Sequence, residues 1–120
     1  MDITEKLLKL TEINNAIQLE EIEYENGLPY YKIEDHLKDM YEILSINGCN
    51  EEFDAYIKKE CLDYINKSIK MSREPIPQHL RAPVERKEKY MPDTIRQLKH
   101  TSTQCIRYLK YGHERFCAVK

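Results

Sequence analysis

Apolar side chains recur every three or four positions through most of the chain, which is the spacing of amphipathic helices. The first such segment covers 3–25, with Asp2 before it as a capping residue and Asn26-Gly27 as its stop. Two further segments cover about 34–46 and 50–71, the latter capped by Asn50. Because strict strand-like alternation is absent, the sequence predicts an all-α fold.

The stretch 72–92 holds four of the five prolines and ends in the charged run Glu85-Arg86-Lys87-Glu88-Lys89. We expect it to form a loop or an extended arm. The last helix is predicted to begin at Asp93 or Thr94 and to reach at least Tyr111, where Gly112 either ends or weakens it. The prediction is a small bundle of about four helices with a long Pro-rich connection before the last one.

A chain of 120 residues with 41% hydrophobic and 33% charged residues suits a single domain, 1–120, with one core. The longest apolar runs, such as Leu7-Leu8, are far too short to cross a bilayer. The N-terminal stretch 1–5 has neither the basic start nor the apolar core of a secretory signal. The default expectation is a cytoplasmic or nuclear protein.

The net charge of −2 conceals a sharp division between the two halves of the chain. Residues 1–60 carry 15 acidic against 6 basic side chains, and residues 61–120 carry 6 acidic against 13 basic ones. Two interpretations are open. The halves can fold against each other and partly neutralise, or the basic half can meet an anionic partner, either nucleic acid or an acidic protein.

Motifs of the common enzyme classes are missing. The chain has three glycines and no glycine-rich phosphate loop, its serines lack a nucleophile-elbow context, and no His-Glu-x-x-His helix is present. His113 and Cys117 have the spacing of two zinc ligands on one helical face, but no Cys-x-x-Cys accompanies them. We therefore expect neither catalysis nor a metal or cofactor.

Tyrosines lie among basic residues in the second half, a combination that can contact a protein partner or hold phosphates and stack bases. The alternative is a solvated basic helix with tyrosines at its packing edge. The candidate binding residues are Arg86, Lys87, Lys89, Tyr90, Arg107, Tyr108, Lys110, Tyr111 and Arg115.

The four cysteines form two pairs with equal intervals, since 11 residues separate Cys49 from Cys61 and 11 separate Cys105 from Cys117. On antiparallel helices Cys61 would face Cys105, and Cys49 would face Cys117. However, 12 steps along a helix leave the two cysteines of one interval about 120° apart. Disulfides at both ends would need coiling or a break at Gly112, and the alternative is four free thiols behaving as small buried hydrophobes.

Two equally spaced cysteine pairs on a helical hairpin resemble the coiled-coil-helix-coiled-coil-helix proteins of the mitochondrial intermembrane space, which carry twin Cys-x9-Cys motifs. The resemblance covers the cysteine pattern only, and this chain departs from it in its 11-residue intervals and in its long linker. It implies a disulfide-stapled assembly factor or accessory subunit in that compartment.

The leading hypothesis is a non-catalytic interaction protein, such as an adaptor, inhibitor or accessory subunit, that docks on another protein through its basic C-terminal half. The first alternative is the disulfide-stapled hairpin, and the second is a nucleic-acid-binding helical module. Membrane insertion is not expected, and the oligomeric state stays open.

Overall fold

The computed structural model describes residues 2–28, 30, 32–45, 50–73 and 84–117, without the side chains of 71–73 and 84–91. All the regular elements of this part of the chain are helical, which confirms the predicted all-α fold. The elements are α1 (Ile3–Glu25), α2 (Ile33–Leu44), α3 (Glu51–Ile57), η1 (Lys58–Leu62), α4 (Asp63–Arg73), α5 (Val84–Gly112) and η3 (His113–Cys117), where η1 and η3 are π-helical turns.

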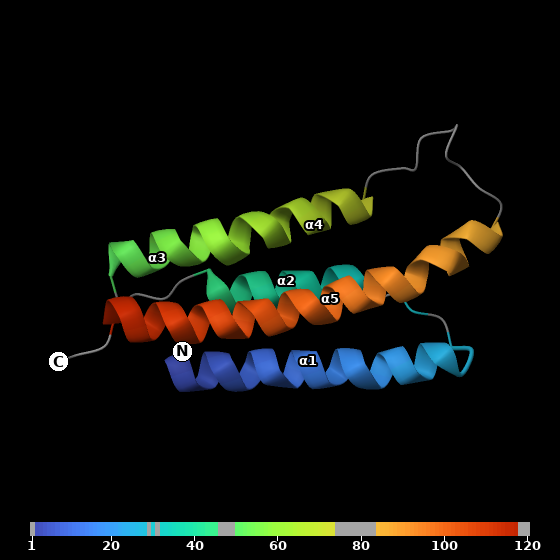
Figure 1. Cartoon of the computed structure of the whole chain (residues 1–120), viewed down its shortest axis with the longest axis horizontal. Coiled ribbons are helices and arrows are strands. Elements are labelled where there is room, and N and C mark those ends of the chain that lie inside the picture. The colour runs from blue at the N-terminus through green and yellow to red at the C-terminus, as the bar shows by residue number, and fades with distance from the viewer. Residues whose placement is uncertain (1, 29, 31, 46–49, 74–83, 118–120) are drawn as a thin grey trace.

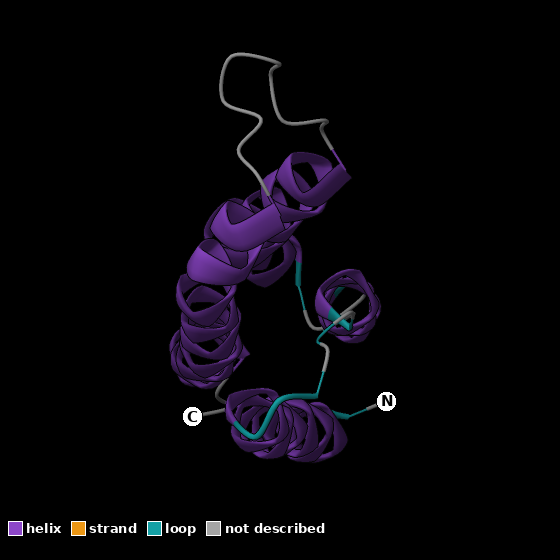
Figure 2. Cartoon of the chain, turned by 90° about the vertical axis from the view of Figure 1, so that its right-hand side faces the viewer, coloured by secondary structure: helices purple, strands orange, loops and turns teal. Residues whose placement is uncertain are grey.

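The helices form a bundle in which successive long segments run in opposite directions (Figure 1). α3, η1 and α4 make one continuous helical segment, and α5 lies between this segment and α1. α2 lies behind α5 and packs against α1 and α4. The end-on view shows the helices grouped around a common interior (Figure 2). Each contributes apolar side chains to one core, including Leu10, Ile17, Met40, Leu44, Phe53, Ile57, Ile65, Ile95 and Leu109.

The predicted bounds of the first helix are confirmed, together with both of its end signals. The Asp2 carboxylate accepts a hydrogen bond from the Glu5 amide at 2.8 Å. At the other end the amide of Gly27 donates to the carbonyl of Tyr24, and that of Leu28 donates to Glu23. Gly27 has a φ of 99°, a left-handed conformation that glycine adopts without a steric penalty. This stop turns the chain back toward α2.

The prediction of a loop or arm over 72–92 is wrong at both ends. α4 continues to Arg73 and α5 already begins at Val84, so that Pro92 lies inside a helix; residues 74–83 lie outside the described part of the chain. Five of the eight residues from Val84 to Met91 are Glu, Arg or Lys, which favour helix. Figure 1 shows the first turns of α5 bending away from the rest, which is how a helix accommodates a proline.

The segment predicted as one helix over 50–71 has the expected cap, since the amide of Phe53 donates to the Asn50 side chain at 2.7 Å. Its middle, however, is the π turn η1. In the same way the α-helical part of α5 ends at Gly112, but the chain continues helically as η3. None of the helices in the described part of the chain combines the length and apolarity that a membrane span requires.

Tyr30, between α1 and α2, is buried, and its hydroxyl has no hydrogen-bond partner among the described residues. Burial, helped by the nearby charges of Glu20 and Glu21, raises the pKa of this hydroxyl well above its ordinary value. Tyrosine rings at the margin of a core usually keep the hydroxyl in water. The Tyr30 hydroxyl is instead removed from water, and the described residues offer it no hydrogen bond in compensation.

The substitution Tyr30→Phe should therefore raise the free energy of unfolding, by about 1 kcal/mol, because it removes an unsatisfied buried polar group and keeps the ring. Urea denaturation followed by circular dichroism measures the change. Tyr64→Phe is the control, since the Tyr64 ring is half exposed and its loss of a hydroxyl should leave stability unchanged. A loss of stability in Tyr30→Phe would show that the hydroxyl makes a favourable contact.

Candidate interaction site

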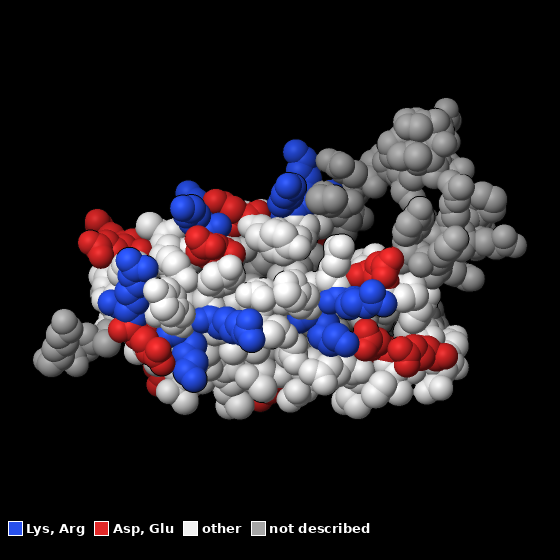
Figure 3. Space-filling view, in the orientation of Figure 1, with Lys and Arg blue, Asp and Glu red and all other residues white. Residues whose placement is uncertain are grey.

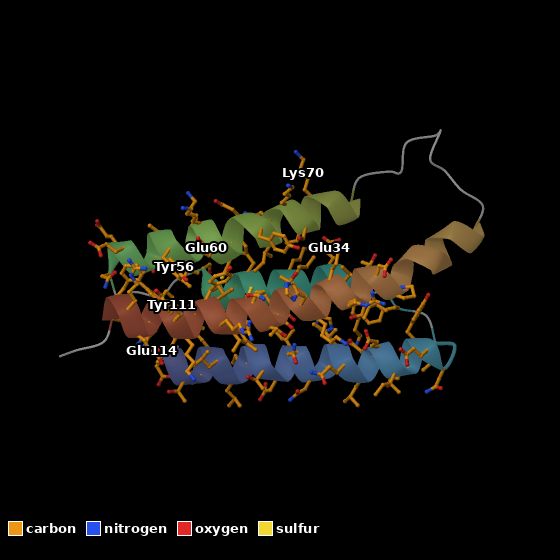
Figure 4. All side chains as sticks on the ribbon, viewed as in Figure 1. Glu34, Tyr56, Glu60, Lys70, Tyr111 and Glu114 are labelled. Carbon is orange, nitrogen blue, oxygen red and sulfur yellow. The ribbon has the colours of Figure 1, made fainter. Side chains whose placement is uncertain are left out.

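An aromatic cluster joins α3 to the C-terminal end of α5. Tyr56 is at its centre, with ring centroids 6.2 Å from Tyr108, 6.1 Å from Tyr111 and 5.5 Å from Phe116. Figure 4 shows Tyr56 and Tyr111 together between the two helices. Burial, followed by the charge of Glu60, raises the pKa of the Tyr56 hydroxyl above its ordinary value.

Gly112 allows the two helices to approach this closely. A Cβ atom at position 112 would lie 2.8 Å from Cδ1 of Tyr56 and 3.0 Å from Cε2 of Phe53. Real Cβ atoms do not come as close as the first of these distances. The sequence marked Gly112 as the end of a helix, but its main role in the structure is to leave room for the Tyr56 ring.

Basic side chains adjoin the cluster on its solvent side. The Arg115 guanidinium lies 5.3 Å from the centroid of the Phe116 ring, and its Nη1 donates to the Tyr111 hydroxyl at 3.3 Å. Arg107 and Lys110 are also exposed, eight and five residues before Arg115. Figure 3 shows Lys and Arg side chains along the face that α5 presents to solvent. We call Arg107, Lys110, Tyr111 and Arg115 the α5 surface.

The structure divides the set of candidate binding residues in two. Tyr108, Tyr111 and Arg115 belong to the aromatic cluster or contact it, and Arg107 and Lys110 adjoin it. The other four candidates, Arg86, Lys87, Lys89 and Tyr90, lie in the first turns of α5, and their side chains are outside the described residues. At 1.5 Å per residue the two groups are roughly 25–30 Å apart, so they do not form one compact site. The sequence did not mark Tyr56 and Phe116 as members, because only the fold brings α3 and η3 to this place.

The acidic and basic halves do meet, along the contact between α1 and α5. Lys99 Nζ lies 2.8 Å from Glu21 Oε1, and Asn14 Nδ2 donates to Ser102 Oγ at 2.6 Å. The charges of the two halves are therefore partly neutralised inside the molecule. The bases of the α5 surface lie farther round the helix and remain exposed.

Cys61 and Cys105 face each other across the contact between η1 and α5, at the pairing that the intervals predicted. Both are buried and both are free thiols, so no disulfide joins them. The hydrogen bond between the two sulfurs, followed by burial, raises the pKa of the Cys61 thiol far above its ordinary value. Such a thiol is unreactive in the folded protein because it does not ionise.

Cys117 lies beside the start of α3, with its sulfur 4.0 Å from Nδ2 of Asn50, which also donates to the Phe116 carbonyl at 2.6 Å. Cys49 lies outside the described residues, so its pairing with Cys117 stays a prediction. His100 is exposed, and no group of three metal-ligating side chains is arranged to hold a metal ion in the described parts of the chain.

The π turn η3 brings the second cysteine of the C-terminal interval back toward the face of the first. η3 ends at Cys117, so the helical interval from Cys105 to Cys117 includes one π turn. A π turn takes up one residue more than an α turn, and 12 steps then rotate by nearly the angle of 11, which is about 20° beyond three full turns. The other interval begins at Cys49, which lies outside the described residues.

Comparison with known protein families, curated proteins and solved structures finds no match to this chain.

The substitution Gly112→Ala should destabilise the protein by about 1–3 kcal/mol, because the new methyl group overlaps the Tyr56 ring. Denaturation of Gly112→Ala, Tyr56→Ala and the double variant measures the coupling. Tyr56→Ala removes the ring that meets the methyl group, so the double variant should lose much less than the sum of the two single losses. Simple additivity would show that the cost arises from the helix backbone and not from this contact.

Cys61 and Cys105 should react with a thiol reagent only after unfolding, because both are buried and Cys61 does not ionise near neutral pH. The measurement uses a Cys49→Ser, Cys117→Ser variant, in which these are the remaining cysteines. The folded protein should show no rapid reaction, and the denatured, unreduced protein should show both thiols. Absence of reaction after denaturation would reveal a disulfide between them.

Proposed function

We propose that the protein is a non-catalytic interaction protein that docks on an acidic segment of another protein through the α5 surface. The observation that carries the proposal is Tyr111, a large ring that is 52% exposed and is contacted on its sides by Tyr56 and Arg115. Tyrosine and arginine are enriched among the residues that dominate binding energy at protein interfaces.

The surroundings of Tyr111 limit the entropy that it loses on binding. The Tyr56 ring packs against it, Arg115 donates to its hydroxyl, and the Phe116 ring holds the guanidinium from the other side. A side chain ordered before it meets its partner costs less to immobilise in a complex. The exposed side chains of Arg107 and Lys110 lie beside Tyr111 and attract an acidic partner at longer range.

The charge distribution favours a protein over nucleic acid as the partner. A nucleic-acid duplex presents phosphates over a long distance. α1, which packs along α5, carries six acidic against two basic side chains, and these acids would repel the phosphates. Glu114 of η3, which is exposed and lies on the α1 side of α5 in Figure 4, adds to this negative charge. A compact acidic protein segment can pair with the bases of the α5 surface without approaching α1.

Capture of partners from a cell extract should depend on Tyr111 more than on any single base. The test compares immobilised wild type with Tyr111→Ala, and uses Tyr64→Ala as a matched control, because Tyr64 is exposed to a similar degree, at 49%, on α4. Proteins bound by wild type and by Tyr64→Ala, but lost from Tyr111→Ala and from Arg107→Glu with Lys110→Glu, support the proposal. Equal capture by all variants contradicts it.

A labelled oligonucleotide of arbitrary sequence tests the nucleic-acid alternative in the same set of variants. We expect no complex with wild type at about 0.15 M salt, since few bases on the surface leave few counterions to release. Tight binding that falls steeply with salt, and that the Arg107→Glu, Lys110→Glu variant abolishes, would overturn the choice of a protein partner.

A disulfide-stapled hairpin in the mitochondrial intermembrane space is the second candidate, and the contact of Cys61 with Cys105 between antiparallel helical segments favours it. Oxidation of such a pair by a disulfide-bearing thiol oxidase, before folding buries the thiols, would transfer two electrons and two protons to the oxidant. Protein isolated with its thiols blocked at lysis distinguishes the candidates. Blocking of all four cysteines would eliminate the disulfide-stapled hairpin, whereas protein in which no cysteine is blocked would support it.

A further inference from the structure

α1 and α2 run antiparallel and enclose a groove of about 410 Å³. On α1 it is lined by Glu12, Ile13 and Ala16, and on α2 by Asp39 and Ile43, among others. The groove is partly open to solvent, so a ligand can enter it from outside.

The groove lies on the flank of α1 that faces away from α5. Asn14 and Glu21, which bond to α5, lie about 150° round the helix from Ala16. The groove is therefore separate from the α5 surface, and a ligand can occupy it while the α5 surface is engaged.

The floor of the groove is apolar and its rim is acidic. Ile13, Ala16 and Ile43 form the apolar part, and Glu12, Asp39 and Glu42 are the exposed acids at the edges. Lys9 is the basic residue among the lining side chains. His36 also lines the groove, and its Nε2 atom lies 2.7 and 2.8 Å from the two carboxylate oxygens of Glu20.

Two large exposed hydrophobic side chains extend the apolar surface along α1. Leu8 and Leu19 are 59% and 64% exposed. They stand four residues before and seven residues after Glu12, a spacing that places all three on one stripe of the helix. Leu8 and Leu19 thus place apolar side chains on the shoulder of the groove on either side of Glu12, about 16 Å apart, which is the rise of 11 helical residues.

The charge of the surroundings indicates what can occupy the groove. α1 and α2 together carry ten acidic against three basic side chains. An anionic or neutral ligand gains nothing from this field, whereas a cationic one is attracted to it and oriented by it. A groove between two antiparallel helices, with an apolar floor, matches the way in which an amphipathic helix binds to a partner.

We propose that the groove between α1 and α2 binds a basic amphipathic helix of a partner protein. Apolar side chains of that helix lie on Ile13, Ala16 and Ile43, and its Lys or Arg side chains pair with Glu12, Asp39 and Glu42. The proposal is independent of the function proposed for the α5 surface, and it adds a second partner of opposite charge.

A second copy of this chain fits the groove less well than a separate helix does. The α1 face of another copy would bring acidic side chains against acidic ones, which costs binding energy. The α5 helix of another copy is basic, but α1 and the α3–α4 segment flank it in its own bundle (Figure 1) and prevent it from lying between α1 and α2 of a second molecule.

The test uses a synthetic amphipathic peptide of about five helical turns, built from leucine and lysine, and a matched peptide in which glutamate replaces lysine. Fluorescence anisotropy measures binding to wild type and variants at about 0.15 M salt. We expect the lysine peptide to bind and the glutamate peptide not to bind. Methyl shifts of Ile13 and Ile43 on addition of the lysine peptide locate it in the groove.

Two charge-reversed variants separate the groove from general attraction to an acidic protein. Glu12→Lys with Glu42→Lys should weaken binding at least about tenfold, because it removes two rim partners. Glu23→Lys with Glu25→Lys makes the same change in net charge on exposed residues that do not line the groove, and should change binding by less than about threefold. Equal effects of the two double variants would overturn the proposal.

Ala16→Phe tests the floor, because a ring at this half-buried position fills the groove without altering its charge. Binding should be lost while the helix content and the thermal midpoint stay close to wild type. Unchanged affinity in Ala16→Phe would overturn the proposal. Self-association of the free protein that the groove variants abolish would also overturn it, since a second copy would then be the occupant.

Discussion

The packing of α5 against α1 on one side and against α3 and η1 on the other is the interaction on which the rest of the structure depends. Ile95, Leu98, Ser102, Cys105 and Leu109 form one buried stripe of this helix. Two members of the stripe are small, and each meets a polar or sulfur group of its neighbour, Ser102 with Asn14 and Cys105 with Cys61. Because these contacts are specific and α5 touches most other elements, they fix the positions of α1 and α3 relative to each other.

Local signals account for the parts of the fold that the sequence predicted well. Asp2, Gly27 and Asn50 act within four residues of their own positions, through hydrogen bonds or backbone conformations that belong to helix ends. The failures arise where a distant contact decides. The prolines of 72–92 predict an arm that includes Val84 to Pro92, which is helical in the structure. The π turns have no sequence signal of their own, because the one-residue shift in their backbone hydrogen bonds depends on packing against the neighbouring helix.

The candidate site shows the same limit. Tyr108, Tyr111 and Arg115 are close in sequence on one helix, so their grouping could be predicted, but Tyr56 comes from a helix more than 50 positions earlier. Conversely, the basic composition of the second half predicts Tyr90 and Arg107 in one binding site. The 17 helical steps between them place these two positions about 25 Å apart. The sequence predicts only a local role for Gly112, at the end of a helix. The Tyr56 ring, for which Gly112 leaves room, comes from a helix distant in the sequence, so this contact could not be predicted.

Internal neutralisation and exposed charge were treated as alternatives for the divided sequence, but in the bundle they occur together. A helix in a bundle presents one side to its neighbour and another to solvent. On α1 and α5 the sides that meet carry Glu21 and Lys99, which pair, whereas the remaining charges point elsewhere. α5 consequently keeps Arg107 and Lys110 exposed, and α1 keeps Glu12 exposed at the groove with α2. The two helices therefore differ in the sign of their charge, since α1 carries six acidic against two basic side chains and α5 carries three acidic against seven basic ones, while the net charge of the chain is only −2.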